Sequence, residues 1–146
     1  KFFGCDGMDG ILTVEGFDTA LAEGLVLMTP FDANASDEAT QSFVSKFKEK
    51  MDGLVPNQFA ADGYDAVYAV VAAVKQAGVK PEDGLKASQL CEKLKVAMTQ
   101  IKVDGATGLG MTWNDKGEPE KEPKAMYIDV TKDENGVYSA VYKAAE

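Results

Sequence analysis

The sequence has 146 residues, about one ordinary domain, and its 45% hydrophobic and 27% charged residues are typical of a globular protein. Its 24 acidic and 15 basic residues give a net charge of −9, which disfavours nucleic acid because no basic surface can displace counterions from phosphates. The chain has no histidine, which excludes Ser–His and Cys–His catalysis and any histidine-based metal site.

The first ten residues, KFFGCDGMDG, combine an apolar run with a glycine-rich acidic loop. Phe2 and Phe3 predict a buried strand, and the loop carries Asp6 and Asp9 to its carboxyl end. Ligands of open α/β folds bind at this end of the strands. The segment therefore predicts half of a binding site. A start at Lys1 without methionine is typical of a piece of a longer protein.

The next fifty residues predict short helical turns, a strand and a helix. Residues 11–24 are divided by glycines, and residues 25–31 form a second apolar run that Pro30 ends as a strand. Asn34 or Ser36 is expected to cap the following helix, since their side chains accept hydrogen bonds from free N–H groups. That helix has one apolar face and ends at Gly53.

A helix from about 57 to 77 is the most apolar element of the sequence. Apolar side chains surround nearly its whole circumference, so we expect it to be buried on several sides. Phe59 lies in its first turn, where it can face a cleft. A third helix carries an apolar stripe that ends at Ile101.

The last forty residues predict short strands and turns. One strand ends at Trp113, before a turn at Asn114–Gly117. Two alternating segments flank Asn135-Gly136, a dipeptide typical of a type I′ hairpin. The chain therefore reads as one α/β segment with about five strands and three main helices.

The two cysteines and the two loop aspartates each have a plain interpretation. Cys5 and Cys91 lack CxxC spacing and are expected to be buried thiols, although the sequence leaves a disulfide between them open. Asp6 and Asp9 could form a general acid–base pair. In a glycine-rich loop, however, it is commoner that one aspartate caps a helix and the other is a solvated loop residue. No calcium loop, phosphate-binding loop or cofactor motif is found, so no metal or cofactor is expected.

Four blocks in order resemble a known family: FFGCDGMD, AEGLVLMTPF, NQFAADGYDAVYAVVAAVKQAG and DGATGLGMTWNDKGEPEK. They resemble the C-terminal portion of the type I periplasmic binding proteins, in the leucine/isoleucine/valine-binding branch that serves ABC transporters. The resemblance implies a bilobed α/β fold of which this chain is the C-terminal part, closed by a β-hairpin. By analogy, residues 1–28 belong to the second lobe, 29–129 to the first-lobe helices and hinge strands, and 130–146 to a second-lobe hairpin.

The resemblance also implies the ligand contacts. The family's acidic residue after the first strand falls on Asp6, which would pair with the ammonium of an amino acid, with Gly7 and Met8 shaping the cleft beside it. Its aromatic residue five positions before Tyr64 falls on Phe59, which would supply an apolar wall. Asp9 is then expected to be a local cap.

The function implied is capture of an amino acid, branched-chain or otherwise aliphatic, without catalysis, followed by docking on a membrane permease of an ABC transporter. The location would be extracellular or periplasmic, with a lipid anchor possible in the full-length protein. The alternatives are a ligand-sensing domain of a signalling receptor and, further off, an enzyme based on Asp6 and Asp9. Helix 57–77 lacks a sheet to cover it, so we expect rearrangement, domain-swapped or homo-oligomeric association, or an exposed apolar patch.

Overall fold

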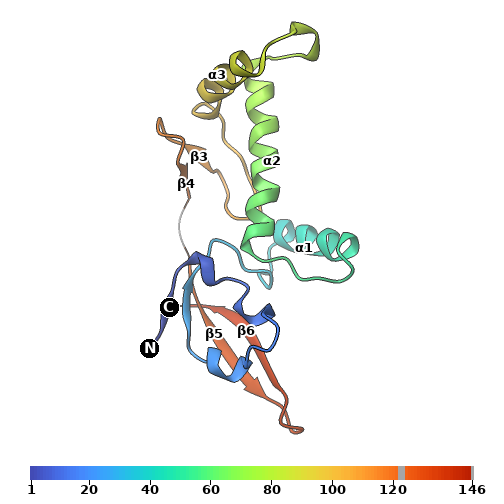
Figure 1. Ribbon diagram of the computed structural model, residues 1–146, viewed down its shortest axis with the longest axis vertical. Coiled ribbons are helices and arrows are strands. Elements are labelled where there is room, and N and C mark those ends of the chain that lie inside the picture. The colour runs from blue at the N-terminus through green and yellow to red at the C-terminus, as the bar shows by residue number, and fades with distance from the viewer. Residues whose placement is uncertain (122–123, 146) are drawn as a thin grey trace. The chain divides into compact units, whose positions relative to one another are not determined.

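Segments from both ends of the chain form one four-stranded sheet in the order β1-β2-β5-β6 (Figure 1). Its strands are β1 (Phe3–Gly4), β2 (Val26–Met28), β5 (Ala125–Lys132) and β6 (Tyr138–Ala144). β1 pairs with β2 in parallel, and β5 is antiparallel to both β2 and β6. The predicted strands at both ends of the sequence are thus confirmed, and the structure shows that they are neighbours in one sheet.

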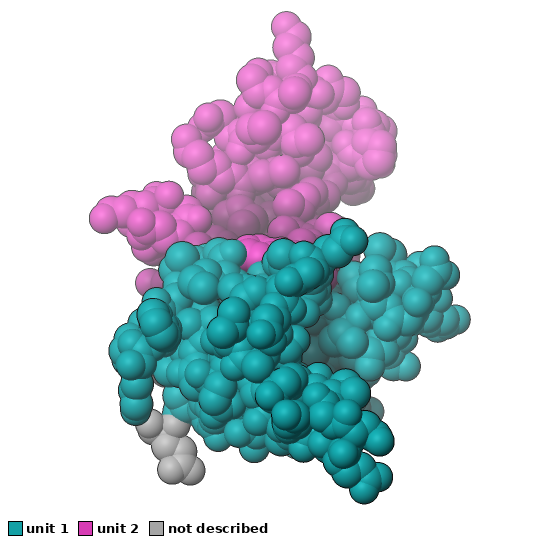
Figure 2. Space-filling view, turned by 60° about the horizontal axis from the view of Figure 1, so that its bottom comes forward, with its two compact units in different colours: residues 1–58, 123–146 teal, residues 59–122 magenta. Residues whose placement is uncertain are grey.

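The computed structural model describes residues 1–121 and 124–145. The chain divides into two compact units, which Figure 2 distinguishes by colour. Unit 1 consists of residues 1–58 and 123–146, and unit 2 of residues 59–122. The lobe boundaries implied by the family resemblance stay a prediction.

The core of unit 1 lies against the sheet. Leu27 and Ile128 are fully buried and pack with Ala22 and Leu25. Three short 3₁₀ helices contribute to this unit: η1 (Asp6–Met8), η2 (Ile11–Thr13) and η3 (Thr19–Ala22). These helical turns confirm the interpretation of residues 11–24.

Helix α1 (Glu38–Lys50) begins one residue after its cap. The cap is Asp37, whose carboxylate accepts a hydrogen bond from the Thr40 N–H at 2.9 Å, so the prediction of Asn34 or Ser36 is wrong. This hydrogen bond lowers the pKa of Asp37. Asp37 directly precedes the first helical residue, from where its side chain reaches the free Thr40 N–H.

The C-terminal hairpin joins β5 and β6, as predicted, but its turn differs from the prediction. Asp133 O accepts from the Gly136 N–H, and the Asp133 N–H donates to Val137 O. Only Gly136 has a positive φ, of 82°, within this turn. A type I′ turn needs positive φ at both central residues, so this is a type I turn with a glycine bulge.

Unit 2 is built on two helices and a small sheet (Figure 1). All but the first residue of α2 (Gln58–Ala77) lie in it, followed by η4 (Pro81–Asp83), α3 (Ala87–Met98), β3 (Thr112–Trp113) and β4 (Pro119–Glu120). Its core consists of Ala69, Ala73, Ala97, Ile101 and Val103. The described residues thus hold the three predicted α-helices, and α2 starts one residue later than expected.

Several side chains predicted to be buried are exposed. Phe2 and Phe3 are 81% and 74% exposed, because β1 is a two-residue edge strand with β2 as its partner. Cys5 and Cys91 are free and exposed. Cys91 lies beside the apolar stripe of α3 rather than on it, and Cys5 lies in the loop after β1, so neither thiol reaches a core.

Helix α2 is buried on one side and not on several. Its small side chains Ala61, Ala69 and Ala73 are buried, while Val67 and Val70 are more than half exposed. The expected exposed apolar surface is thus observed on this helix, whereas rearrangement and association stay predictions. The surface is exposed because α3 covers a narrow alanine stripe.

Candidate ligand-binding site

The loop after β1 is shaped by its own backbone. The Met8 N–H donates to Cys5 O at 3.1 Å and the Asp9 N–H to Asp6 O at 2.9 Å, which forms η1. The Asp6 carboxylate is exposed and accepts the Gly7 N–H at 2.9 Å. Asp6, Gly7 and Met8 are therefore held together in one turn.

The members of this turn differ in their surroundings. Asp6 and Gly7 are exposed, whereas Met8 is half-buried and packs against the core of unit 1. Gly4 is required below it, because a Cβ there would collide with the Met8 and Leu27 side chains. Met8 thus anchors the turn to the sheet, which leaves the Asp6 carboxylate at the surface.

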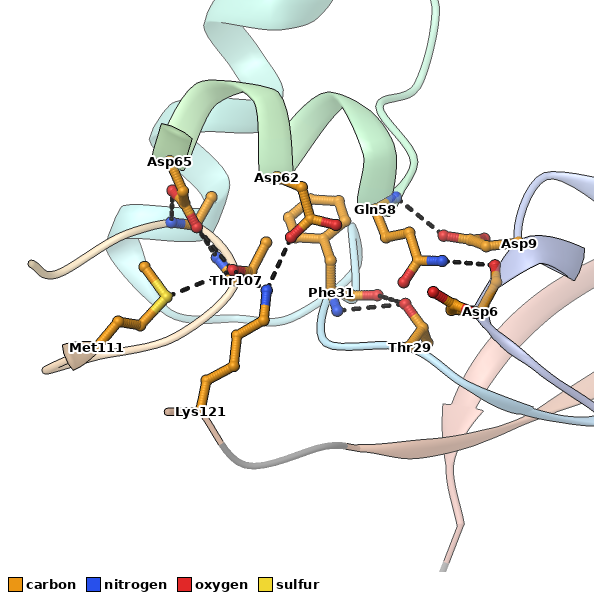
Figure 3. A network of polar contacts seen from close by, with 11 residues as sticks. Asp6, Asp9, Thr29, Phe31, Gln58, Asp62, Asp65, Thr107, Met111 and Lys121 are labelled. Carbon is orange, nitrogen blue, oxygen red and sulfur yellow. Dashed lines mark hydrogen bonds and ion pairs between the residues drawn. The ribbon is translucent and has the colours of Figure 1, made fainter. Parts of the chain in front are cut away.

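Gln58, the first residue of α2, forms hydrogen bonds with this loop (Figure 3). Its backbone N–H donates to the Asp9 carboxylate at 2.9 Å, and its side-chain amide donates to the Asp6 carbonyl. Asp9 therefore acts as a cap, as predicted, but it caps a helix 49 residues away and not its own loop. A carboxylate at a helix N-terminus also meets the positive end of the helix dipole.

A pocket of about 280 Å³ lies in unit 1 next to this loop. Asp9 and Phe31 contribute to its wall, together with Tyr142 of β6. Burial, followed by the negative charge of Asp9, raises the pKa of Tyr142 to about 12. The Tyr142 hydroxyl is buried and makes no hydrogen bond within the described part of the chain.

Phe59 occupies the first turn of α2, directly after Gln58, and its ring is 49% exposed. The structure thus places three of the four predicted ligand residues in η1 and the fourth next in sequence to the residue that binds that loop. Their contacts with a ligand stay predictions. Gln58 was not foreseen; a polar residue at the start of a very apolar helix is the signal that could have found it.

Two of the sequence blocks meet in unit 2 through a buried aspartate (Figure 3). Asp65 is 5% exposed, and its carboxylate accepts from Ala106 N, Thr107 N and Thr107 Oγ1 at 2.7–2.8 Å. Lys121 donates to Thr107 Oγ1 and forms an ion pair with Asp62 at 2.8 Å. The third and fourth sequence blocks, which contain Asp65 and Thr107, therefore hold one another in place.

Gly105 is the glycine that this contact requires. A Cβ at Gly105 would collide with the Asp65 carboxylate. Gly105 thus serves close packing against α2. In the described ranges, no group of three or more Cys, Asp or Glu side chains is placed to hold a metal ion.

A family model described as "Periplasmic binding protein" matches residues 5–133. The chain belongs to this family. The match covers most of the sequence and includes the Asp6 loop, Gln58, Phe59 and the Asp65 network. No curated protein matches the sequence significantly.

Solved structures show the same fold. A leucine-binding protein LivK from Thermotoga maritima is 24% identical, with a TM-score of 0.66, over 97% of this chain and 36% of its own. The isoleucine complex of LivJ from Streptococcus pneumoniae is 21% identical, with a TM-score of 0.67, over 98% and 37%. A solute-binding protein of an ABC transporter from Rhodopseudomonas palustris, in complex with 3,4-dihydroxybenzoic acid, is 23% identical, with a TM-score of 0.68, over 99% and 36%.

The chain spans about a third of the length of these structures. The α/β fold is therefore part of the type I periplasmic binding protein fold, as expected from the sequence blocks. Across residues 1–121 and 124–145, none of the helices has the length and apolar character needed to cross a membrane.

Proposed function

We propose that this chain is part of the extracellular or periplasmic solute-binding component of an ABC transporter and binds an aliphatic amino acid between two lobes. The family match over residues 5–133 carries the proposal. The protein would bind its ligand without changing it and then dock on the transporter's permease in the membrane. A lipid anchor would keep the full-length protein near that permease.

The Asp6 carboxylate supports an amino acid over an aromatic acid as the ligand. Its exposed oxygen atoms are free to face a ligand ammonium, and the Gly7 N–H fixes one of them. A charge-assisted hydrogen bond of this kind strengthens when water is excluded. A benzoate-type ligand would instead bring its carboxylate toward a group of the same charge.

Phe59 supports an aliphatic side chain on that amino acid. Its ring is half exposed in the first turn of α2 and offers apolar surface to a ligand. Leucine, isoleucine and valine are rich in the aliphatic groups that gain most from such contact, at about 0.8 kcal/mol per buried CH₂.

Closure of the two proposed lobes needs a hinge, and Thr29-Pro30 is the proposed crossing between them. Thr29 Oγ1 donates to Phe31 O at 3.1 Å and accepts from Phe31 N at 3.3 Å, on either side of Pro30. This tight turn supports a defined crossing at Thr29-Pro30. A ligand that contacts both lobes shifts the population toward the closed form by its differential affinity.

The test is calorimetry on the protein with any flanking sequence retained. Leucine and isoleucine are expected to bind, and 3,4-dihydroxybenzoate to bind much more weakly. Asp6→Asn should reduce leucine affinity by about tenfold or more, since hydrogen bonds to charged groups contribute about 1.5–3 kcal/mol. Asp115→Asn, in an exposed turn, is the control. Unchanged leucine affinity in Asp6→Asn would contradict the ammonium contact.

A further inference from the structure

Gln58 is a buried polar side chain at an unusual place. It is 1% exposed and is among the largest fully buried side chains of the chain, whereas glutamine is mostly found at the surface. It follows Pro56-Asn57 and precedes Phe59 at the start of α2. Burial of an amide is unfavourable unless its hydrogen bonds are satisfied, so its partners explain its presence.

Two hydrogen bonds of Gln58 reach the loop that carries Asp6. The backbone N–H binds the Asp9 carboxylate, and the side-chain amide binds the Asp6 carbonyl across 52 residues of sequence (Figure 3). Asp6 is thus held from two directions, by Gln58 through its carbonyl and by Gly7 through its carboxylate. These hydrogen bonds, with those within η1, fix the conformation of the turn.

We propose that Gln58 is a positioning residue for ligand binding, which holds the turn that carries the Asp6 carboxylate. This inference rests on the proposed function. Pre-organised groups bind more tightly because less conformational freedom is lost on binding. Gln58 would not touch the ligand; it would act by holding the Asp6 turn.

The chemistry at this position requires a donor. The Asp6 carbonyl can only accept, so a side chain at position 58 that hydrogen-bonds to it must present an N–H or O–H group. Methionine has the length of glutamine but no donor. An ionised carboxylate also has none, and it would add a negative charge near Asp9. A protonated carboxyl group would restore an O–H donor at nearly the same place.

The experiment compares Gln58→Met and Gln58→Glu with the wild type, with Gln76→Met as the control. Gln76 lies on the same helix, but it is exposed and pairs with Gln100. Amide hydrogen exchange at Met8 and Asp9 reports the order of the turn, and calorimetry with leucine reports binding. Gln58→Met is expected to speed exchange at both amides and to weaken leucine binding by about tenfold, the effect of one lost hydrogen bond.

Gln58→Glu separates positioning from general damage to the fold. Burial and the nearby Asp9 charge raise the pKa of the introduced carboxyl group, so lowering the pH from about 8 to about 5.5 should protonate it. Leucine affinity relative to the wild type at the same pH should then recover. The affinity ratio of Gln58→Met should stay constant over this range.

Three results would overturn the inference: unchanged exchange at Met8 and Asp9 in Gln58→Met, unchanged leucine affinity beside faster exchange, or no pH-dependent recovery in Gln58→Glu. If Gln58→Met does not fold, the pH-dependent recovery of leucine affinity in Gln58→Glu alone decides whether the inference holds. A wild-type protein that binds no amino acid contradicts the proposed function. The exchange rates then still show whether Gln58 holds the turn.

Discussion

The two units stabilise their cores by different means. Unit 1 buries the large aliphatic side chains Leu27 and Ile128 against a sheet. Unit 2 buries alanines between α2 and α3 and satisfies a buried carboxylate, Asp65, with three hydrogen bonds. Unit 1 therefore packs large aliphatic side chains against its sheet, whereas unit 2 adds a buried polar network to a helix contact lined by alanines.

The difference extends to the surface of α2. Its alanines allow α3 to come close, but an alanine buries little apolar area, and the valines of the opposite face stay exposed. Hydrophobic stabilisation scales with the area removed from water. The contact between α2 and α3 thus gains little hydrophobic stabilisation, and loss of a hydrogen bond of Asp65 should lower the stability of unit 2 noticeably. Substitutions that separate these two sources of stability test the comparison.

The largest effect is expected from Leu27→Ala in unit 1. Leu27 is fully buried, and removal of a buried leucine side chain costs about 2–5 kcal/mol of the unfolding free energy. Hydrogen exchange at the β5 amides should accelerate accordingly, while the fluorescence of Trp113 in unit 2 should follow the wild-type transition. Leu21→Ala, at a position 75% exposed, is the control and should change stability by less than about 0.5 kcal/mol.

A somewhat smaller effect, on the other unit, is expected from Asp65→Asn. The amide keeps the size of the side chain but replaces one acceptor oxygen with an NH₂ group that faces other donors. The loss should be about 2 kcal/mol, as for hydrogen bonds to a buried charged group. Urea unfolding monitored by Trp113 fluorescence measures it. If Asp65→Asn reduced exchange protection at the β5 amides of unit 1 by the same free energy, the Asp65 network would not be a source of stability particular to unit 2.

The sequence predicts those parts of this arrangement that depend on local signals. Periodicity places α2 to within one residue, and Pro30 and the Asn135-Gly136 pair correctly predict the end of β2 and the hairpin. Local signals are less specific about detail, since the observed cap of α1 and the observed type of hairpin turn both differ from the predicted ones. Several polar residues near a helix start can cap it, and geometry alone selects Asp37.

Features that depend on distant contacts are missed. The exposed Phe2 and Phe3 look like a buried strand because apolar content does not tell an edge from a centre. The Asp65–Thr107 and Gln58–Asp6 contacts join residues 42 and 52 positions apart, beyond any local pattern. For the candidate site, the place of Asp6 after a strand and of Phe59 in a first helical turn pointed to these residues, and the resemblance then gave them a ligand role. It said nothing of Gln58, which binds to backbone and leaves no motif.

Two glycine substitutions of opposite sign test the close approach in unit 2. Gly105→Ala places a methyl group against the Asp65 carboxylate, which three hydrogen bonds hold, and should cost about 1–2 kcal/mol by overpacking. Gly63→Ala, where nothing lies within 4 Å of the added Cβ, should stabilise α2 by up to about 1 kcal/mol. Thermal unfolding of both variants checks the contrast; stabilisation by Gly105→Ala would contradict it.

The exposed face of α2 should affect association more than folding. Val67→Ser and Val70→Ser should each change the unfolding free energy by no more than about 0.5 kcal/mol, because both side chains are more than half exposed. If the 146-residue chain self-associates through this face, light scattering at rising concentration will show oligomers that the double variant lacks. A monomer at every concentration would contradict the predicted homo-oligomeric or domain-swapped association.

The smallest effect at neutral pH is expected from Tyr142→Phe in unit 1. The Tyr142 hydroxyl is buried without a hydrogen bond in the described chain, so its removal should be neutral or slightly stabilising. Alkaline pH should reveal a larger difference. The pKa of Tyr142 is raised to about 12 in the folded state by burial and by Asp9, above the value of about 10 in an unfolded chain.

The folded state therefore holds this proton more tightly, and its contribution to stability is present below pH 10 and lost between pH 10 and 12. Tyr142→Phe should lose less stability than the wild type over that range. Urea unfolding at pH 9 and pH 11 measures the difference, and absorbance of ionised tyrosine near 295 nm assigns the titration. Tyr138→Phe, in the same strand but exposed, should match the wild type. Equal pH sensitivity of Tyr142→Phe and the wild type would mean that folding does not raise the pKa of Tyr142.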